Sequence, residues 1–223
     1  MDKITSGLTF LNDHTDMGFF KLRQIKDSVY EKEASYYKYV NGQKVPAGFM
    51  SLIEGIVADN SRKIRGDRAD IIMYEEAGSN PDLIKSIDKG EALINVGGNR
   101  VGVAIIGGTG GDEGPYLMGL REVYYKPEAY HVLPFKHNFT QDNSTIISSF
   151  FIPAFKALDR PDIVDERGWC DPEKGKRFYN KERDKQASDP KKLISHCAEF
   201  CFNAEEAFAL EGTNKFNKTA IAN

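Results

Sequence analysis

The chain has 223 residues, of which 40% are hydrophobic and 28% charged, a composition that excludes fibrous and intrinsically disordered proteins. Thirty basic and 33 acidic side chains give a formal net charge of -3, so the overall charge provides no attraction to nucleic acid or to anionic membranes. No apolar stretch approaches the roughly 20 residues that cross a bilayer, and the N-terminus lacks the pattern of a signal peptide. We therefore expect a cytoplasmic protein without a membrane partner.

The beginning of the chain predicts a helix and a hairpin. Asp16–Tyr37 carries apolar residues at helical spacing, which favours a helix. Two short strands, Tyr36–Val40 and Gln43–Val45, flank the pair Asn41-Gly42. Both of these turn residues tolerate positive φ, as a tight hairpin turn requires.

Between residues 64 and 114 the sequence alternates strands with a helix and a Gly-rich loop. Asp70–Glu76 is a short apolar run that ends in two carboxylates, typical of a strand in a parallel sheet covered on both faces. Asp82–Lys89 predicts a short helix, and Arg100–Ile106 predicts a second strand that leads into Gly107–Gly114. This alternation predicts an α/β fold. Because ligands bind at the carboxyl ends of strands in such sheets, the acidic pair and the Gly-rich loop indicate one site.

The second half of the chain predicts a change of organisation near residue 156. Tyr116–Tyr125 favours a helix, Pro127 ends it, and Tyr130–Phe135 is a strand candidate. Between residues 156 and 192, 11 of 37 residues are basic and 9 are acidic, which predicts an exposed excursion. We therefore divide the chain into residues 1–155 and a charged, helical region over residues 156–223.

Two helix starts are predicted within this last region. Asp189-Pro190 favours a helix that continues to Phe202. A second helix is predicted after Asn203, which caps it, with Glu206 reaching back to the helix start.

The acidic pair is suited to phosphoryl-transfer chemistry. Apolar residues followed by two acids at a strand end are the arrangement of a Walker B element. Glu75 would hold Mg²⁺ through its water ligands, and Glu76 would orient and deprotonate the attacking water. The alternative is a strand that ends in two solvated acids.

The Gly-rich loop and the arginines before the acidic strand are further candidates. Backbone amides at Gly108 and Gly110 can approach a phosphate closely, and the Thr109 hydroxyl can contact it. Arg65 and Arg68 are candidates for stabilising transferred phosphate, although a solvated loop is the alternative. The loop lacks the G-x-x-x-x-G-K-[ST] pattern of a P-loop, and it lacks the dinucleotide fingerprint as well. A simple tight turn therefore remains an alternative for the loop.

A metal site in the last third of the chain is a minor alternative. His196 and Cys197 lie one helical turn from Cys201, with Cys170 upstream, and these residue types bind zinc. No C-x-x-C pair is present, and an odd number of cysteines fits reduced thiols. The remaining histidines show no sequence neighbourhood that indicates a catalytic triad.

Four motifs in this order resemble the large terminase subunit of tailed double-stranded DNA phages. They are Arg65-Gly66, Glu75-Glu76-Ala77-Gly78, Gly108-Thr109-Gly110-Gly111 and Ala204-Glu205-Glu206-Ala207-Phe208. The resemblance implies an ATPase of the P-loop (RecA/ASCE) class with a mostly parallel sheet. It also implies that Glu75 is the Walker B carboxylate on the metal side, that Glu76 is the catalytic glutamate, and that Gly108-Thr109-Gly110 is the coupling motif.

The same resemblance implies cofactors, partners and a place of action. ATP and Mg²⁺ would be the cofactors, and double-stranded DNA, a small terminase subunit and a portal would be the partners. The parent motor would form an oligomeric ring in the cytoplasm of a bacterial host. The family's P-loop and nuclease carboxylates are not found in the 223 residues, so we expect part of such a motor, with weak ATP binding alone. A non-catalytic interaction module is the alternative, and a nucleotide-sugar or dinucleotide enzyme that uses the Gly-rich loop is a third hypothesis.

Overall fold

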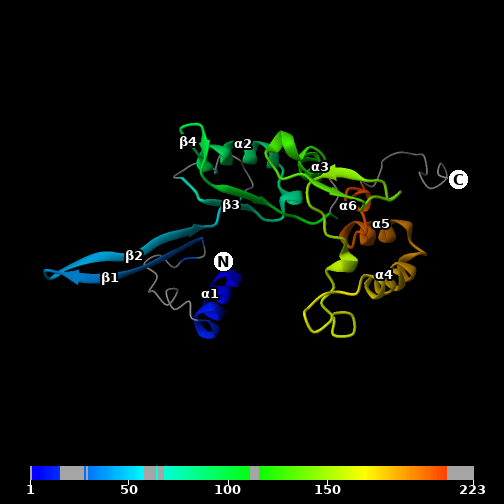
Figure 1. Cartoon of the computed structure of the whole chain (residues 1–223), viewed down its shortest axis with the longest axis horizontal. Coiled ribbons are helices and arrows are strands. Elements are labelled where there is room, and N and C mark those ends of the chain that lie inside the picture. Colours follow the sequence, from blue (N-terminus) through cyan, green and yellow to red (C-terminus); the bar gives the residue numbers. More distant parts are fainter. Residues whose placement is uncertain are drawn as a thin grey trace. The chain divides into compact units, whose positions relative to one another are not determined.

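The structure is a computed structural model that describes residues 2–15, 28, 30–57, 64, 68–110 and 116–209. The chain divides into two units, Met1–Val57 and Ala58–Asn223, whose main elements are labelled in Figure 1. The boundary predicted after residue 155 falls within the second unit and stays a prediction. Within the described ranges, no helix combines the length and apolar character needed to cross a bilayer.

The first unit contains a helix and a long β-hairpin. Helix α1 (Asp2–His14) precedes strands β1 (Glu31–Val40) and β2 (Gln43–Glu54), which pair antiparallel. Asn41 and Gly42 join the strands with φ of 51° and 78°, the positive values that match the twist of a two-residue hairpin. The predicted hairpin is confirmed, and its strands are longer than expected.

The helix predicted over Asp16–Tyr37 is wrong for residues 31–37, which form strand β1. Residues 16–27 and 29 lie outside the described part of the chain. Tyr36 and Tyr37 pair with Ala47 and Pro46 across the hairpin. Aromatic residues favour strands, and the tight turn places a partner strand beside them.

The second unit is built on a pair of short parallel strands. β3 (Ile71–Tyr74) pairs with β6 (Val103–Ile106) so that Ile71 lies opposite Val103 and Tyr74 opposite Ile106. The chain between them forms the 3₁₀ turn η3 (Ala77–Ser79), helix α2 (Leu83–Ile94) and a small hairpin of β4 (Asn95–Val96) and β5 (Asn99–Arg100). The predicted order of strand, helix and strand is confirmed, and the unit is mixed α/β (Figure 1).

Helix α2 covers one face of this sheet. Its buried residues Leu83 and Ile87 belong to a hydrophobic core cluster with Tyr74. The Tyr74 hydroxyl donates to the backbone oxygen of Ser86 at 2.9 Å, and a Cβ at position 90 would overlap that hydroxyl. Glycine at 90 therefore lets the phenol lie directly on the helix. Further strand residues packed against this cluster are Ile72, Ala104 and Ile106.

The opposite face of the sheet is exposed. Ile71, Met73, Val103 and Ile105 have 65%, 67%, 58% and 47% of their surface accessible. The expectation that both faces are covered is therefore wrong for the described chain. The physical reason is topological, because the crossover helix α2 lies on one face and cannot cover the other.

The chain then forms a helix and a second hairpin. Helix α3 (Leu117–Tyr125) is confirmed, and Pro127 begins the 3₁₀ turn η4 (Pro127–Tyr130). The strand predicted over Tyr130–Phe135 is wrong, since β7 (Phe135–His137) begins only at its last residue and pairs with β8 (Ile146–Ser148). His131 has a φ of 53°, and Pro134 has no N–H for a strand ladder.

Three helices close the second unit, after the 3₁₀ turn η5 (Ala154–Lys156). They are α4 (Pro172–Gln186), α5 (Pro190–Glu199) and α6 (Ala204–Ala207). Side chains of Asp171, Asp189 and Asn203 accept hydrogen bonds from first-turn amides, as N-caps do. The predicted helix starts at 190 and 204 are confirmed, although α5 ends before Phe202. The charged excursion contains helix α4, which buries Tyr179.

Candidate functional site

The parallel pairing brings the two predicted motifs to the same end of the sheet. The Gly107 amide donates to the backbone oxygen of Tyr74 at 3.0 Å, and the Ala77 amide donates to that of Gly107 at 2.9 Å. The acidic pair follows β3 directly and the Gly-rich loop follows β6 directly. The two segments are therefore joined at the carboxyl ends of neighbouring strands, where ligands of open α/β sheets bind.

One hydrogen bond links the two motifs through their side chains. The Thr109 hydroxyl donates to Oε2 of Glu76 at 3.2 Å, and both residues are exposed. Glu76 has φ 49° and ψ 46° and precedes η3 as its N-cap. A non-glycine residue in this left-handed region costs free energy, and such residues concentrate at functional sites. The backbone turn places the Glu76 carboxylate beside Thr109.

The glycines of the loop allow close packing on two sides. A Cβ at position 108 would lie 3.0 Å from the Ala77 nitrogen and 3.1 Å from the Gly78 nitrogen. A Cβ at position 110 would overlap the backbone oxygen of Ala207 in α6. Gly108 and Gly110 therefore let the loop lie between η3 and α6. The sequence pattern predicted phosphate contact for these glycines and gave no signal for the contact with α6.

The arginine candidates are only partly described. Arg65 lies outside the described residues, as does Gly66. Arg68 is described and exposed. Among the described residues, no hydrogen bond or ion pair joins Arg68 to Glu75, Glu76 or Thr109. The role of either arginine stays a prediction.

A second carboxylate near the loop has a different environment. Glu206 in α6 receives hydrogen bonds from Arg183 at 3.0 Å (Nη1 to Oε1) and 2.7 Å (Nη2 to Oε2), and the Phe202 amide donates to its Oε2 at 2.6 Å. The guanidinium carbon of Arg183 lies 3.6 Å from the centre of the Phe202 ring. Asn203 accepts from the Glu206 amide at 2.8 Å, as predicted for the cap. This geometry joins α4 to α6 and leaves the Glu206 carboxylate fully engaged.

A histidine with a serine neighbour occurs where the sequence indicated none. His137 Nε2 lies 2.7 Å from Oγ of Ser148 and 3.1 Å from the hydroxyl of Tyr124. The Phe139 amide donates to Nδ1 at 3.1 Å, so the proton of the neutral ring sits on Nε2. Such a histidine cannot take a proton from Ser148, which is completely buried. The β7–β8 pairing brings these residues together for a structural role, and residue spacing gave no signal for it.

The sequence candidates for a metal site lie in α5, with His196 and Cys197, and just after it, with Cys201. Burial raises the pKa of Cys201 to about 11, and it also raises the pKa of Cys197. Burial therefore disfavours the thiolate form of both side chains. The described residues contain no cluster of three His, Cys, Asp or Glu side chains with metal-binding geometry.

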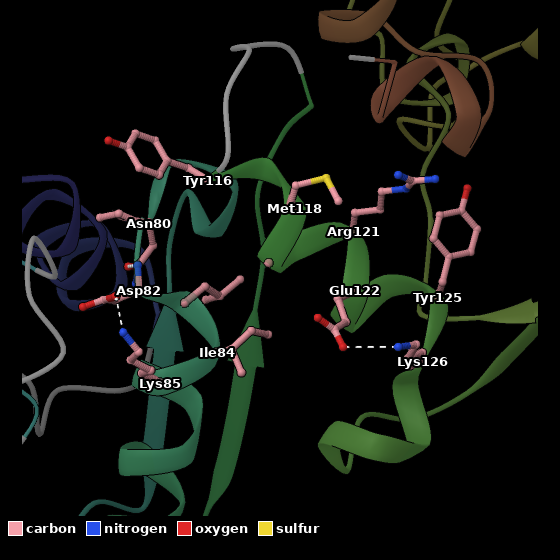
Figure 2. A pocket seen from close by; sticks show the side chains of 13 residues that line it. Asn80, Asp82, Ile84, Lys85, Tyr116, Met118, Arg121, Glu122, Tyr125 and Lys126 are labelled. Carbon is pink, nitrogen blue, oxygen red and sulfur yellow. Dashed lines mark hydrogen bonds and ion pairs between the residues drawn. The ribbon is translucent and has the colours of Figure 1, made fainter. Parts of the chain in front are cut away.

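A groove of about 620 Å³ lies between the start of α2 and helix α3. Figure 2 shows that two ion pairs border it, Asp82 with Lys85 and Glu122 with Lys126. The nitrogen and oxygen atoms of each pair are 3.3 Å apart. The groove is lined by neither the acidic pair nor the Gly-rich loop. The candidate site at the sheet edge is therefore an exposed surface site, separate from this groove.

Comparisons with known proteins do not identify a relative. No protein-family model matches the chain, and neither curated proteins nor solved structures give a match.

Proposed function

We propose that this chain supplies the Walker B and coupling elements of a DNA-packaging ATPase of the large terminase type, with a P-loop NTPase-like core. The hydrogen bond between Thr109 and Glu76 across two parallel strands carries the proposal. It couples a carboxylate suited to activating water with a loop that follows the neighbouring strand. A nucleotide-dependent shift of that loop would change the orientation of the carboxylate.

The acidic pair fits the chemistry of magnesium and water activation. Glu75 and Glu76 are exposed carboxylates, and oxygen ligands of this kind suit Mg²⁺, which retains part of its water. Bound Mg²⁺ would neutralise charge on the phosphates of ATP. Glu75 would accept hydrogen bonds from metal-bound water, and Glu76 would orient the attacking water and take its proton.

The packing of the Gly-rich loop favours a coupling role over phosphate binding. A Cβ at position 108 or 110 would meet backbone atoms of η3 or α6, so the protein itself fills the space that these glycines leave. We therefore assign the loop to coupling. The chain carries no P-loop motif, and the phosphates of ATP would have to be held by residues from another polypeptide segment.

The uncovered sheet face supports the same proposal. Parallel sheets are usually covered on both faces, whereas Ile71, Met73, Val103 and Ile105 are exposed in the described chain. A further polypeptide segment that holds the phosphate loop would cover this apolar face. Double-stranded DNA, the small terminase subunit and the portal would be partners of the assembled ring.

A titration, the flanking DNA sequence and a co-expression experiment test the proposal. Isothermal titration of the chain alone with Mg-ATP should show no tight binding, and micromolar affinity would contradict the need for a separate phosphate loop. The DNA flanking the coding sequence should contain a reading frame with a P-loop. Co-expression of its product should give a complex that hydrolyses ATP.

Matched variants in that complex test the named residues. Glu76→Gln should lower ATP turnover at least about 100-fold, the usual loss when a general base is removed. Glu128→Gln, an exposed substitution in η4, should leave turnover unchanged. Equal turnover in the two variants would remove Glu76 from the mechanism.

A non-catalytic interaction module is the second candidate function. The observation that favours it is the exposed apolar face formed by Ile71, Met73, Val103 and Ile105. In that case a co-purifying partner would cover this face, and the complex would hydrolyse no ATP with or without Glu76. ATP turnover of the wild-type complex therefore separates the two functions.

A further inference from the structure

The loop between η5 and α4 presents the single tryptophan of the chain to solvent. Trp169 has 73% of its surface accessible, and the loop over residues 157–171 leads into α4 (yellow in Figure 1). Single exposed apolar side chains are common on protein surfaces and need no explanation. Trp169 differs from them in two respects, the rigidity of its loop and the charge around it.

Hydrogen bonds from the Asp165 side chain and from the backbone close the loop. Oδ1 of Asp165 accepts from the amides of Arg167 and Trp169 at 2.9 and 2.8 Å. The Asp165 amide donates to the Trp169 oxygen at 2.9 Å, and the Gly168 amide donates to the Asp165 oxygen at 2.9 Å. Gly168 has a φ of 78°, which closes the turn at low cost because glycine lacks a Cβ.

The base of the loop is anchored in the protein. Val164 and Cys170 form an isolated β-bridge, and Ile163 is only 5% exposed. The thiol of Cys170 donates to the backbone oxygen of Phe155 at 3.1 Å. The indole is therefore displayed by a preorganised loop, and binding a partner would cost little conformational entropy.

The loop around the tryptophan is acidic. Residues 157–171 contain five acidic and two basic residues, and Arg160 is paired with Asp162 at 3.1 Å. Within the described chain, Glu166 makes no ion pair. The Asp165 carboxylate, which accepts from the Trp169 amide, would repel nucleic acid phosphates and attract cations.

We propose that this loop is a docking surface for a basic polypeptide segment. An arginine or lysine of the partner packs on the face of Trp169, and neighbouring cations lie close to Asp165 and Glu166. Cation–π contacts are strongest with tryptophan, and tryptophan is enriched among the residues that dominate binding energy at interfaces. This inference does not depend on the proposed ATPase function.

The sole tryptophan provides a direct test. The probe is a fluorescein-labelled peptide, acetyl-Gly-Arg-Leu-Arg-Gly-Arg-amide, titrated into the full chain at low salt. Its binding should change the emission of Trp169 and raise the anisotropy of the label. Trp169→Ala should weaken binding about tenfold, the factor that corresponds to a cation–π contact of 1.4 kcal/mol.

Control variants separate the site from general charge attraction. Tyr39→Ala removes a side chain of similar exposure, 74%, from the other unit and should leave peptide affinity unchanged. Gly168→Ala keeps the indole but disfavours the positive φ, so it should weaken binding by a smaller factor. Equal peptide affinity of wild type and Trp169→Ala would overturn the proposal, as would quenching of Trp169 by a single-stranded oligonucleotide but not by the peptide.

Discussion

The tripeptide Glu-Glu-Ala occurs twice in this chain, at residues 75–77 and 205–207, and the two copies differ in what their second glutamate contacts. Glu76 is exposed and receives one side-chain hydrogen bond, from Thr109. Glu206 is partly buried and holds Arg183 and the Phe202 amide. The same residue types form an exposed carboxylate with one hydrogen bond in one place and a structural ion pair in the other.

Both copies contact the Gly-rich loop through their alanine. Gly108 lies against the amide of Ala77, and Gly110 lies against the backbone of Ala207. The two alanines are buried, with 1% and 5% of their surface accessible. The chemistry available to a carboxylate therefore depends on the neighbours that the fold brings to it, and four measurements test this difference.

We expect the largest difference in the free energy of unfolding between the variant that lacks Glu206 and the variant that lacks Glu76. Glu206→Ala should lower the free energy of unfolding by about 2–3 kcal/mol, because Arg183 and the Phe202 amide lose their acceptor in a partly buried site. Glu76→Ala should change it by less than about 1 kcal/mol, as expected for an exposed side chain. Urea unfolding of both variants measures this, and equal losses would contradict the assignment of Glu206 as structural.

Substitutions of the loop glycines test the contact with the second copy. Gly110→Ala should cost about 2 kcal/mol, since the new Cβ overlaps the Ala207 oxygen and the backbone must move. Gly107→Ala is the matched control, because no atom lies within 4 Å of a Cβ there. Thermal unfolding should show a lower midpoint only for Gly110→Ala, and a similar shift in both variants would refute the packing role of Gly110.

Acidification should weaken the region around the second copy. Burial lowers the pKa of His137, and the charge of Glu205 partly opposes this shift. The neutral ring is therefore favoured in the fold, so its contribution to stability is complete above the unfolded pKa of about 6.5 and is lost as the pH falls through the lower folded pKa. Urea unfolding at pH 7.5 and pH 5 measures this effect. The free energy of unfolding should fall less between the two pH values in His137→Gln than in the wild type.

Glu205→Gln tests the same titration of His137 by removing the charge that raises its pKa. Without the Glu205 charge the pKa of His137 should fall further, and the loss of stability on acidification should grow. Unchanged pH dependence in both variants would exclude His137 as the responsible group.

The smallest effect is expected for the hydrogen bond at the first copy. Thr109→Val should change the free energy of unfolding by about 0.5 kcal/mol or less, because both partners are exposed to water. Thr109→Ser keeps the hydroxyl and serves as the control in the same urea experiment. A loss as large as that of Glu206→Ala would show that Thr109 and Glu76 form a structural contact after all.

Local signals in the sequence predicted much of the second unit. The apolar runs before Glu75 and Gly107 predicted β3 and β6, and the helix starts at Asp189 and Asn203 were read from capping residues. The joint position of the acidic pair and the Gly-rich loop also followed, because parallel strands carry their carboxyl ends to one edge. These features depend on a few neighbouring residues, and they are therefore found in the structure as predicted.

Features that need distant partners were not predictable. The exposed face of the β3–β6 sheet, the pairing of β7 with β8, and the contact of Gly110 with Ala207 join segments that pattern alone does not relate. The two Glu-Glu-Ala copies show the reason most clearly. The sequence pattern placed the first copy at the end of a strand and the second copy at the start of a helix. Tertiary packing alone decided that Glu206 meets Arg183 while Glu76 stays open to solvent, since an ion pair requires a side chain from a separate helix.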